Sequence, residues 1–195
     1  MKLRLLATVV VVLALTTVAA HAQIGLYVNP AFIQVKNNTP DTGLFAFLGE
    51  GNTSRTFYGA NIGGYYDFYH NGKLEAGIDI RDSISHSNGA SLNGFLVGPR
   101  VAGSPFQFPL KPYAQVFIGA GRTRAATTSV GVTRAQFGIL AGADYTLHRH
   151  IDFRVIEVGY SSLSTVSSYT NGSNLNSYPA SRLLSFSTGL VFRFR

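Results

Sequence analysis

The segment from Leu184 to Phe194 alternates between apolar residues and small, polar or charged residues. One side carries Leu184, Phe186, Thr188, Leu190, Phe192 and Phe194, and the other carries Ser185, Ser187, Gly189, Val191 and Arg193. A period of two is typical of a β-strand with one face in apolar surroundings. A soluble strand turns that face to a core, whereas a strand of a membrane barrel turns it to lipid and its polar face to a narrow interior.

Seven further segments show the same period, and residues that favour turns separate them. The eight predicted strands are 24–36, 57–69, 73–85, 93–103, 112–123, 133–146, 150–163 and 183–195. Strands of this length match a tilted membrane crossing, which takes about 9 to 11 residues. In the seventh strand Asp152 and Arg154 share a face but Glu157 is out of phase, so we expect a bulge at Val155-Ile156.

The connections between these segments differ in length. The short ones are 70–72, 104–111 and 146–150, and the first contains Asn71-Gly72, a pair that accepts the positive φ angles of a type I′ turn. The longer ones, rich in Asn, Ser, Thr and Gly, are 37–56, 86–92, 124–132 and 164–182. Short periplasmic turns and long extracellular loops are typical of outer-membrane barrels.

The apolar faces carry aromatic residues near the strand ends. Toward the short turns these are Tyr66, Phe68, Tyr145, Phe153, Phe192 and Phe194, and toward the long loops Phe57, Tyr58 and Tyr160. Two aromatic rows around an aliphatic band indicate a membrane barrel, because a soluble core would hold its aromatic residues centrally. In lipid every backbone N–H and C=O group must pair within the protein, so we expect segments 24–36 and 183–195 to meet and close the sheet.

The N-terminus predicts export from the cytoplasm. Lys2 and Arg4 precede an apolar stretch, 5–20, and Ala20-His21-Ala22 fits a cleavage site. We expect residues 1–22 to be a signal peptide and residues 23–195 to be one barrel domain. The alternative, an uncleaved membrane helix, is less favoured because the apolar stretch is shorter than the roughly 20 residues that span a bilayer.

Composition excludes several classes of function. The chain has no cysteine, which removes disulfides, thiol catalysis and cysteine-bound metals. Its formal charge is +7, and loss of the two basic residues of the signal peptide would leave +5. This charge is mild and scattered, so we expect no nucleic-acid partner.

The polar faces of the strands predict a network of charges inside the barrel. Its expected members are Glu75, Asp79, Arg81, Arg100, Asp144, Arg154, Glu157 and Arg193. Eight strands leave a lumen wide enough only for side chains. Inward glycines would make room for the larger side chains, namely Gly59, Gly63, Gly77, Gly98, Gly138 and Gly189. We expect the ion pairs to plug the barrel; the alternative is that they exchange partners and gate a narrow conductance.

Several stretches resemble a known family. They are Glu75–Arg81, Phe95–Arg100, Pro112–Gln115, Ala141–Tyr145, Asp152–Arg154 and Thr188–Phe194. The chain resembles the small outer-membrane barrels of the OmpA-like transmembrane-domain and OmpX-like type. The resemblance implies an all-β fold, an eight-stranded antiparallel up-and-down transmembrane β-barrel, in the cell outer membrane of a Gram-negative bacterium. It also implies help from the barrel-insertion machinery, which reads a terminal aromatic residue; here Arg195 follows Phe194.

Two histidine motifs invite other interpretations. Outer-membrane lipid A deacylases carry a lipid-facing His-x-Ser pair, but here His86 and Ser87 are adjacent and would point to opposite faces. The next glutamate, Glu157, is far along the chain, so we expect a polar loop start rather than a catalytic set. His148 and His150 are two potential metal ligands without a third, so we expect neither metal nor cofactor.

Five arginines lie near or in the predicted long loops. They are Arg55, Arg122, Arg124, Arg134 and Arg182. Lipopolysaccharide phosphates lie at that surface and arginine fits phosphate well, so contacts with lipopolysaccharide and outer-membrane lipid are one interpretation; the alternative is generic solvated loop charge. The sequence favours a non-enzymatic barrel that supports envelope integrity or presents its loops for surface interaction. The alternatives are a narrow small-solute channel, a lipid-modifying enzyme of the outer membrane and a soluble secreted barrel of the lipocalin type. The sequence does not indicate an oligomeric state.

Overall fold

The computed structural model describes residues 23–43, 46–104, 109–163, 168–171, 174–177 and 180–194. The predicted signal peptide and Arg195 lie outside these residues. The strands are β1 (Gln23–Lys36), β2 (Ser54–Asn71), β3 (Leu74–Ser87), β4 (Ala90–Gly103), β5 (Leu110–Arg124), β6 (Gly131–His148), β7 (Ile151–Leu163), β8 (Ser168–Asn171), β9 (Asn174–Ser177) and β10 (Ser181–Phe194). Within the described ranges, no helix is both long enough and apolar enough to span a bilayer.

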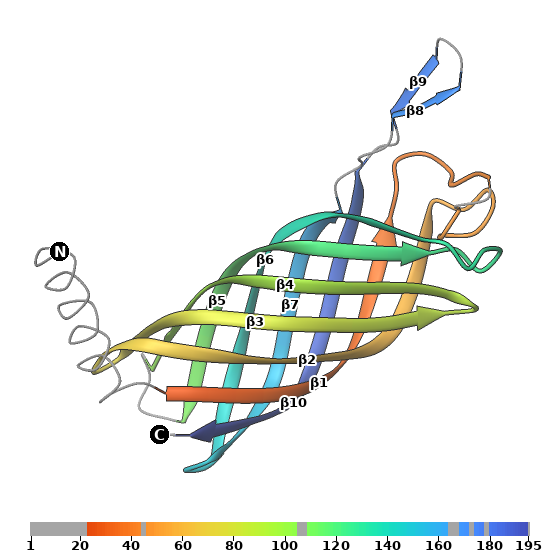
Figure 1. The fold of residues 1–195 in the computed structure, drawn as a ribbon. Helices are drawn as coiled ribbons and strands as arrows, with labels where there is room; N and C mark the ends of the chain where they lie inside the picture. The colour runs from red at the N-terminus through yellow and green to blue at the C-terminus, as the bar shows by residue number, and fades with distance from the viewer. Residues whose placement is uncertain are drawn as a thin grey trace, which may run out of the picture.

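Eight of the strands form a closed antiparallel barrel in the order β1-β10-β7-β6-β5-β4-β3-β2 (Figure 1). The first and last strands of the barrel pair from Ile24 with Phe194 to Lys36 with Arg182, which confirms the predicted closure. Following the register once around from Lys36 returns to β1 at Leu26, ten residues away. This stagger tilts the strands and sets the narrow bore. Strands β8 and β9 form a separate hairpin.

The apolar faces of the strands point outward and the polar faces inward. Residues 78–81 are consecutive on β3. Ile78 and Ile80 are 45% and 48% exposed, whereas the alternate residues Asp79 and Arg81 are 1% and 5% exposed. The other strands of the barrel repeat this alternation. The fold is therefore the predicted one, with its apolar side chains outside and its charges inside.

The prediction for Phe57 was wrong. It was expected in the outer aromatic row with its neighbour Tyr58, but Phe57 is fully buried inside the barrel and Tyr58 is 66% exposed. Consecutive residues of a strand point to opposite faces, so only one of the two can face outward. The other predicted aromatic residues of both rows are exposed, namely Tyr66, Phe68, Tyr145, Tyr160, Phe153, Phe192 and Phe194.

The predicted long loop 86–92 was also wrong. Strand β3 continues to Ser87 and β4 begins at Ala90, so only Asn88 and Gly89 connect them. Their φ angles of 40° and 82° fit a two-residue hairpin turn. The polar residues on both sides of the turn lie in strands and alternate between the two faces, with Ser85 buried and His86 exposed. Connections 37–53 and 125–130, at the same end, are longer.

Replacing Gly89 by alanine tests this tight turn. At a φ of 82° a side chain is strained, and the added Cβ would lie 3.2 Å from the Cβ of Ala126. We expect Gly89→Ala to lower the free energy of unfolding by about 1–2 kcal/mol. Urea unfolding in lipid vesicles, followed by the gel mobility of unboiled samples, measures the change. Asn88→Gly relieves the adjacent positive φ without a clash, so its free energy of unfolding should stay the same or rise slightly. An equal loss of stability in both variants would contradict the tight turn.

The predicted bulge in β7 is confirmed. Toward β6, Ile156 pairs with Ala143 and Arg154 pairs with Asp144, so Val155 has no partner there. The register toward β10 shifts at the same place. The extra residue allows Arg154 and Glu157 to point inward together.

The bulge also explains a polar residue on the outer face of β10. It leaves the carbonyl oxygen of Arg154 outside the regular ladder, and the hydroxyl of Thr188 donates a hydrogen bond of 2.8 Å to it. Thr188 therefore satisfies a backbone group in the apolar band, where water is absent.

Candidate functional site

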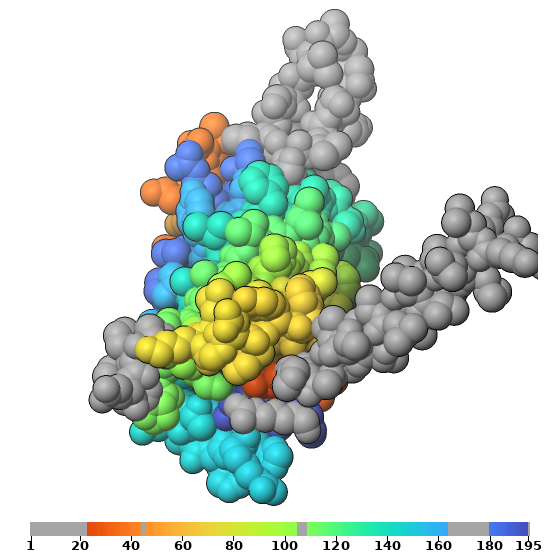
Figure 2. Space-filling model, turned by 90° about the vertical axis from the view of Figure 1, so that its left-hand side faces the viewer, coloured from red at the N-terminus to blue at the C-terminus, as the bar shows by residue number. Residues whose placement is uncertain are grey.

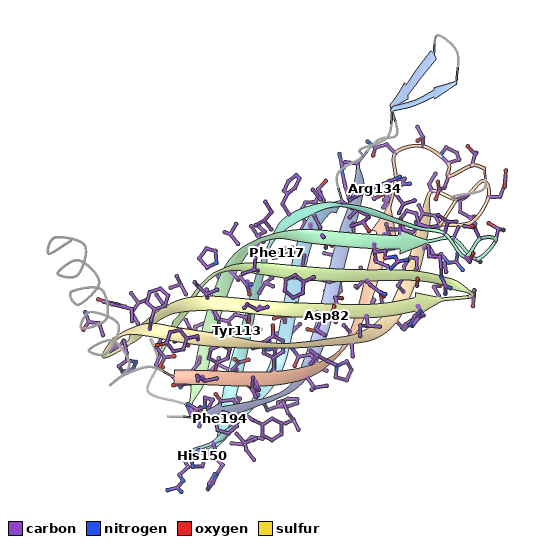
Figure 3. The ribbon with its side chains drawn as sticks, in the orientation of Figure 1. Asp82, Tyr113, Phe117, Arg134, His150 and Phe194 are labelled. Atoms are coloured by element: carbon purple, nitrogen blue, oxygen red, sulfur yellow. The ribbon has the colours of Figure 1, made fainter. Side chains whose placement is uncertain are left out.

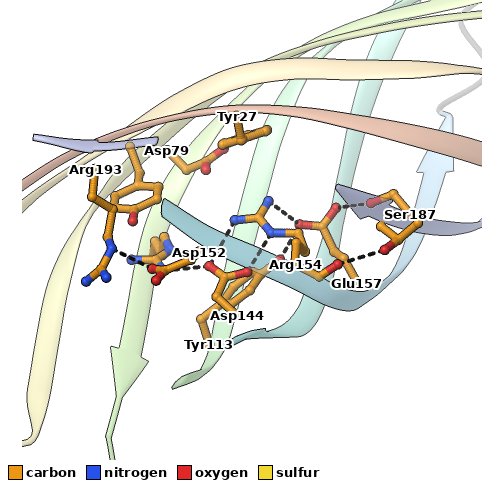
Figure 4. A network of polar contacts seen from close by, with 12 residues as sticks. Tyr27, Asp79, Tyr113, Asp144, Asp152, Arg154, Glu157, Ser187 and Arg193 are labelled. Carbon is orange, nitrogen blue, oxygen red and sulfur yellow. Dashed lines mark hydrogen bonds and ion pairs between the residues drawn. The ribbon is translucent and has the colours of Figure 1, made fainter. Parts of the chain in front are cut away.

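Glu157 is the centre of the polar network inside the barrel (Figure 4). Its carboxylate accepts two hydrogen bonds from Arg81, of 2.5 and 2.7 Å, and a third from Arg154 at 3.2 Å. The hydroxyls of Tyr113 and Ser187 donate at 2.7 and 2.9 Å. The glutamate is 3% exposed. Such a carboxylate is stable in a low-dielectric interior because charged donors surround it.

Arg154 connects Glu157 to a second carboxylate. Its Nε and Nη2 donate to the two oxygens of Asp144 at 2.9 and 3.3 Å. Its guanidinium lies between two aromatic rings, 4.5 Å from the centroid of Tyr27 and 4.6 Å from that of Tyr113. These contacts fix the arginine, which is fully buried, by charge pairing and by cation–π attraction.

The other buried arginines are paired as well. Arg100 lies 2.7 Å from Asp67 and stacks 4.0 Å from the ring centroid of Tyr65. Arg193 lies 2.6 Å from Asp152 near the turn end. Since Arg81 and Arg154 share Glu157, each of the four arginines buried among the described residues faces a carboxylate.

Three tyrosines of the network each cover a glycine on the neighbouring strand. Tyr27 pairs in register with Gly63, Tyr65 with Gly25, and Tyr113 with Gly142. A Cβ on any of these glycines would come within 2.6 Å of the tyrosine ring or hydroxyl. The missing side chains therefore allow the aromatic rings to lie flat across the lumen and reach the arginines.

The structure places all eight predicted network residues inside the barrel, 7% exposed or less. It brings together Arg81, Asp144, Arg154 and Glu157, with Asp79 bonded to the network through the hydroxyl of Tyr27 at 2.8 Å. Glu75 lies apart, near the turn end, 3.3 Å from the exposed His70. Figure 2 shows this turn end of the barrel, from which the β2–β3 turn (yellow) and the β6–β7 turn (cyan) project.

The predicted set did not name several members, among them Tyr27, Tyr65, Asp67, Tyr113, Asp152 and Ser187. All six have the inward phase of their strands, so the alternation alone could have found their faces. The alternation could not show that the tyrosines lie over glycines, because that position depends on the register across strands.

An apolar cluster closes the loop end of the lumen. Phe47 and Leu48, from the connection 37–53, fold back into the barrel and are 4% and 1% exposed. They pack with inward residues of the strands, including Ile33, Val35, Phe57, Leu92, Leu163 and Leu183. This plug contains no charged side chain, so an apolar cluster closes the loop end while paired charges fill the turn half.

Polar contacts hold the folded connection over the plug. The carboxylate of Asp41 accepts a hydrogen bond of 3.0 Å from the backbone N–H of Leu48. Burial raises the pKa of Asp41, although this hydrogen bond acts in the opposite direction. Arg55 donates to the carbonyl oxygens of Phe47, Ser87 and Asn88 at 2.6 to 3.0 Å. Arg55 thus ties the connection to the β3–β4 turn.

The space between the plug and the charged network is small. A cavity of about 30 Å³ lies there, lined by side chains that include Asn61, Arg81, Phe117, Gln136 and Leu140. This volume suits about one water molecule. Phe117 and Tyr113, labelled in Figure 3, both come from β5; Phe117 lines this cavity, and Tyr113 belongs to the charged network.

The five arginines predicted to contact lipid divide into two groups. Arg55 and Arg134 are half-buried; Arg55 is bonded as described, and Arg134 lies close enough to Asp41 to lower the pKa of that carboxyl. Arg122, Arg124 and Arg182 are exposed on the outer face at the loop end. Lys36 pairs with Arg182 across β1 and β10 and adds a cation that the prediction missed.

Neither histidine motif forms a recognisable reaction centre among the described residues. His86 lies opposite Tyr58 and Ser91, and no hydrogen bond joins it to another described residue. The rings of His148 and His150 lie 6.2 Å apart at the turn end. Within the part of the chain that the structure describes, no group of three His, Cys, Asp or Glu side chains is placed to hold a metal ion.

Solved outer-membrane barrels share this architecture. Neisserial surface protein A is 13% identical, with a TM-score of 0.58, and the match covers 88% of this chain and 97% of that one. Ail, the attachment invasion locus protein of Yersinia pestis, is 13% identical with a TM-score of 0.49, over 89% of this chain and 99% of that one. Likeness at this level of identity shows the fold alone. Among curated proteins, none matches the sequence.

The family is shown by a sequence model rather than by these structures. The model described as the outer membrane protein beta-barrel domain matches residues 5–194, nearly the whole chain. With its outward apolar band and its closed ring of eight strands, the chain belongs to the outer membrane protein β-barrel family and resides in the outer membrane.

Proposed function

We propose that the chain is a closed, non-catalytic barrel that supports the integrity of the outer membrane and presents its loops at the cell surface. The observation that carries this proposal is the double closure of the lumen. The apolar plug fills the loop end, and the network around Glu157 fills the turn end. The cavity between them, of about 30 Å³, has no room for a solute.

The surroundings of His86 support a role without catalysis. A general base needs a nucleophile or an orienting carboxylate within hydrogen-bond reach. His86 makes no such bond within the described residues, and Ser87 points to the other face of β3. Ser91, across the hairpin, is 8% exposed. The apolar outer face likewise favours a membrane barrel over a soluble carrier.

The proposed partners are the lipids around the barrel. Arg122, Arg124 and Arg182, with Lys36, are placed to meet the phosphates of lipopolysaccharide at the loop end. During biogenesis, we propose that the barrel-insertion machinery recognises the last strand, β10, as it does in related barrels.

Conductance in planar bilayers tests the closed lumen. Folded protein, verified by a mobility shift on boiling, should give no discrete current steps. A channel would give steps, and replacing Glu157 by glutamine would change their size. Reproducible steps with this dependence would overturn the proposal.

Complementation tests the role in the envelope and the absence of catalysis together. Cells without the chain should take up more of a bulky hydrophobic dye. Wild-type protein and the His86→Ala variant should restore the barrier equally, because the proposal gives the imidazole no chemical role. Failure of His86→Ala at equal amounts in the membrane would favour the enzyme.

A further inference from the structure

Asp82 is a charged residue within the lipid-facing band of the barrel. It lies on β3, labelled in Figure 3, and its side chain is exposed. Its cross-strand partners are Ile62 on β2 and Phe95 on β4. Ile80 and Ile84 flank it along the same face, and all four neighbours are exposed apolar side chains. Asp82 makes no hydrogen bond or ion pair with another described residue.

A carboxylate in this position is unfavourable because hydrocarbon has no groups that solvate it. The cationic residues on the outer faces of the described strands all lie at the loop end, namely Lys36, Arg122, Arg124 and Arg182. None of them is a cross-strand partner of Asp82. The charge of Asp82 therefore calls for hydrogen-bond donors from a molecule outside the described chain.

Two rows of residues connect Asp82 to the loop end across β3, β4 and β5. The nearer row is Ile84, Asn93 and Arg122, and the farther row is His86, Ser91 and Arg124. Neighbours within a row lie about 5 Å apart, and the rise of about 3.3 Å per residue puts Asp82 roughly 13 Å from the farther row. Arg124 thus lies nearest the rim, Arg122 and Asn93 lie in the next row, and Asp82 lies deeper.

Two exposed arginines lie above Asp82 on this surface. Arg122 and Arg124 have no ion pair among the described residues. Asn93 lies between Ile84 and Arg122, and its Oδ1 is buried, so a molecule outside the barrel cannot reach it. The surface therefore offers two exposed cations above the exposed carboxylate of Asp82.

We propose that this outer face of β3, β4 and β5 binds a phosphorylated lipid whose acyl chains carry amide or hydroxyl groups just below the headgroup. The phosphate fits the guanidinium groups of Arg122 and Arg124. The N–H or O–H groups of the chains donate to Asp82. The lipid A part of lipopolysaccharide has this chemistry. The inference rests on the proposed contact with lipopolysaccharide phosphates at the loop end, and it adds Asp82 as the acceptor for the hydrogen-bond donors below the headgroup.

Two other occupants fit less well. A phosphatidyl lipid has ester oxygens below its phosphate, which accept hydrogen bonds but do not donate them, so Asp82 would stay unsatisfied. A second copy of the chain would bring apolar side chains or another Asp82 to the same depth, because its outward cations lie at the rim. Charge and hydrogen-bond complementarity therefore favour the lipid with donors.

Replacing Asp82 tests the deeper half of the site. Wild-type protein, Asp82→Leu and the matched control Ile80→Leu are folded in phosphatidylcholine vesicles with and without lipid A. In phosphatidylcholine alone, Asp82→Leu should be at least as stable to urea as wild type, because a charge has left the lipid face. The apparent affinity for lipid A should fall about tenfold, as expected for the loss of one charge-assisted hydrogen bond. Ile80→Leu should bind as wild type does.

Replacing both arginines tests the rim of the site. The double variant Arg122→Gln/Arg124→Gln should lose lipid A binding, and wild-type protein should bind dephosphorylated lipid A and phosphatidylglycerol weakly. The control Lys73→Gln/Arg149→Gln removes the same charge at the turn end and should bind normally. Equal loss in the control, full binding by Asp82→Leu, or equal binding of phosphatidylglycerol would each overturn the inference. A closed lumen, measured by conductance, would stand in all these cases.

Discussion

Replacing Glu157 by glutamine should cause the largest loss of stability of any single charge change in this barrel. The substitution keeps the shape of the side chain but leaves Arg81 without its bidentate partner and weakens the pairing of Arg154. An uncompensated charge in a dry interior costs about 3–5 kcal/mol. We expect the free energy of unfolding in vesicles to fall by that amount, measured from urea midpoints by gel mobility.

A double-mutant cycle separates lost pairing from general damage. Arg81→Met removes the other partner, and the double variant should lose less stability than the sum of the two single variants, because Arg81 is no longer left without its bidentate partner. Glu50→Gln, an exposed glutamate in the connection 37–53, is the matched control and should change stability by less than about 0.5 kcal/mol. Additive losses in the cycle would show that Glu157 does not hold the network together.

Replacing Gly142 by valine should destabilise the barrel strongly without changing any charge. A Cβ there would lie 2.5 Å from the hydroxyl oxygen of Tyr113 and 2.8 Å from the carbonyl oxygen of Ile156. Tyr113 would have to leave the carboxylate of Glu157, to which it donates at 2.7 Å. We expect a loss of about 1–3 kcal/mol from overpacking, and more if the hydrogen bond breaks as well.

The neighbouring residue supplies the control. Ala141 is next to Gly142 on β6 and is exposed on the outer face, where an added isopropyl group meets lipid. Ala141→Val should fold and unfold as the wild type does, whereas Gly142→Val should show a lower urea midpoint and a smaller folded fraction after dilution into vesicles. If both variants behave alike, the ring of Tyr113 does not depend on the space over Gly142.

The alternation of residues was enough to predict the strands and their faces. Leu184–Phe194, Glu75–Arg81 and the bulge near Val155 could be interpreted locally, because the side-chain period of a strand is a property of the backbone. The same property of the backbone explains the two predictions that were wrong, for Phe57 and for the loop 86–92. Phe57 was grouped with Tyr58 although adjacent residues must point apart, and Asn88-Gly89 was taken for part of a long loop although the same dipeptide at Asn71-Gly72 predicted a tight turn.

The contents of the lumen were predictable only in part. The inward phase identified Glu75, Arg81 and the other charged members, since each lies on the polar side of its own strand. Which arginine meets which carboxylate was not predictable, because Arg81 and Glu157 are 76 residues apart and meet only across the closed barrel. The folding back of Phe47 and Leu48 into the mouth likewise has no local signal.

By itself, the sequence determined the class of fold, the outward apolar band, the inward charges and the resemblance to outer-membrane barrels. Only the tertiary structure decided that Tyr27, Tyr65 and Tyr113 lie over glycines, that an apolar cluster closes the loop end of the lumen, and that Asp82 lies alone among apolar neighbours with Arg122 and Arg124 above it. The reason is physical. The side to which a residue points depends on its own strand, whereas the side chain that it contacts depends on the register and stagger of eight strands closed into a ring.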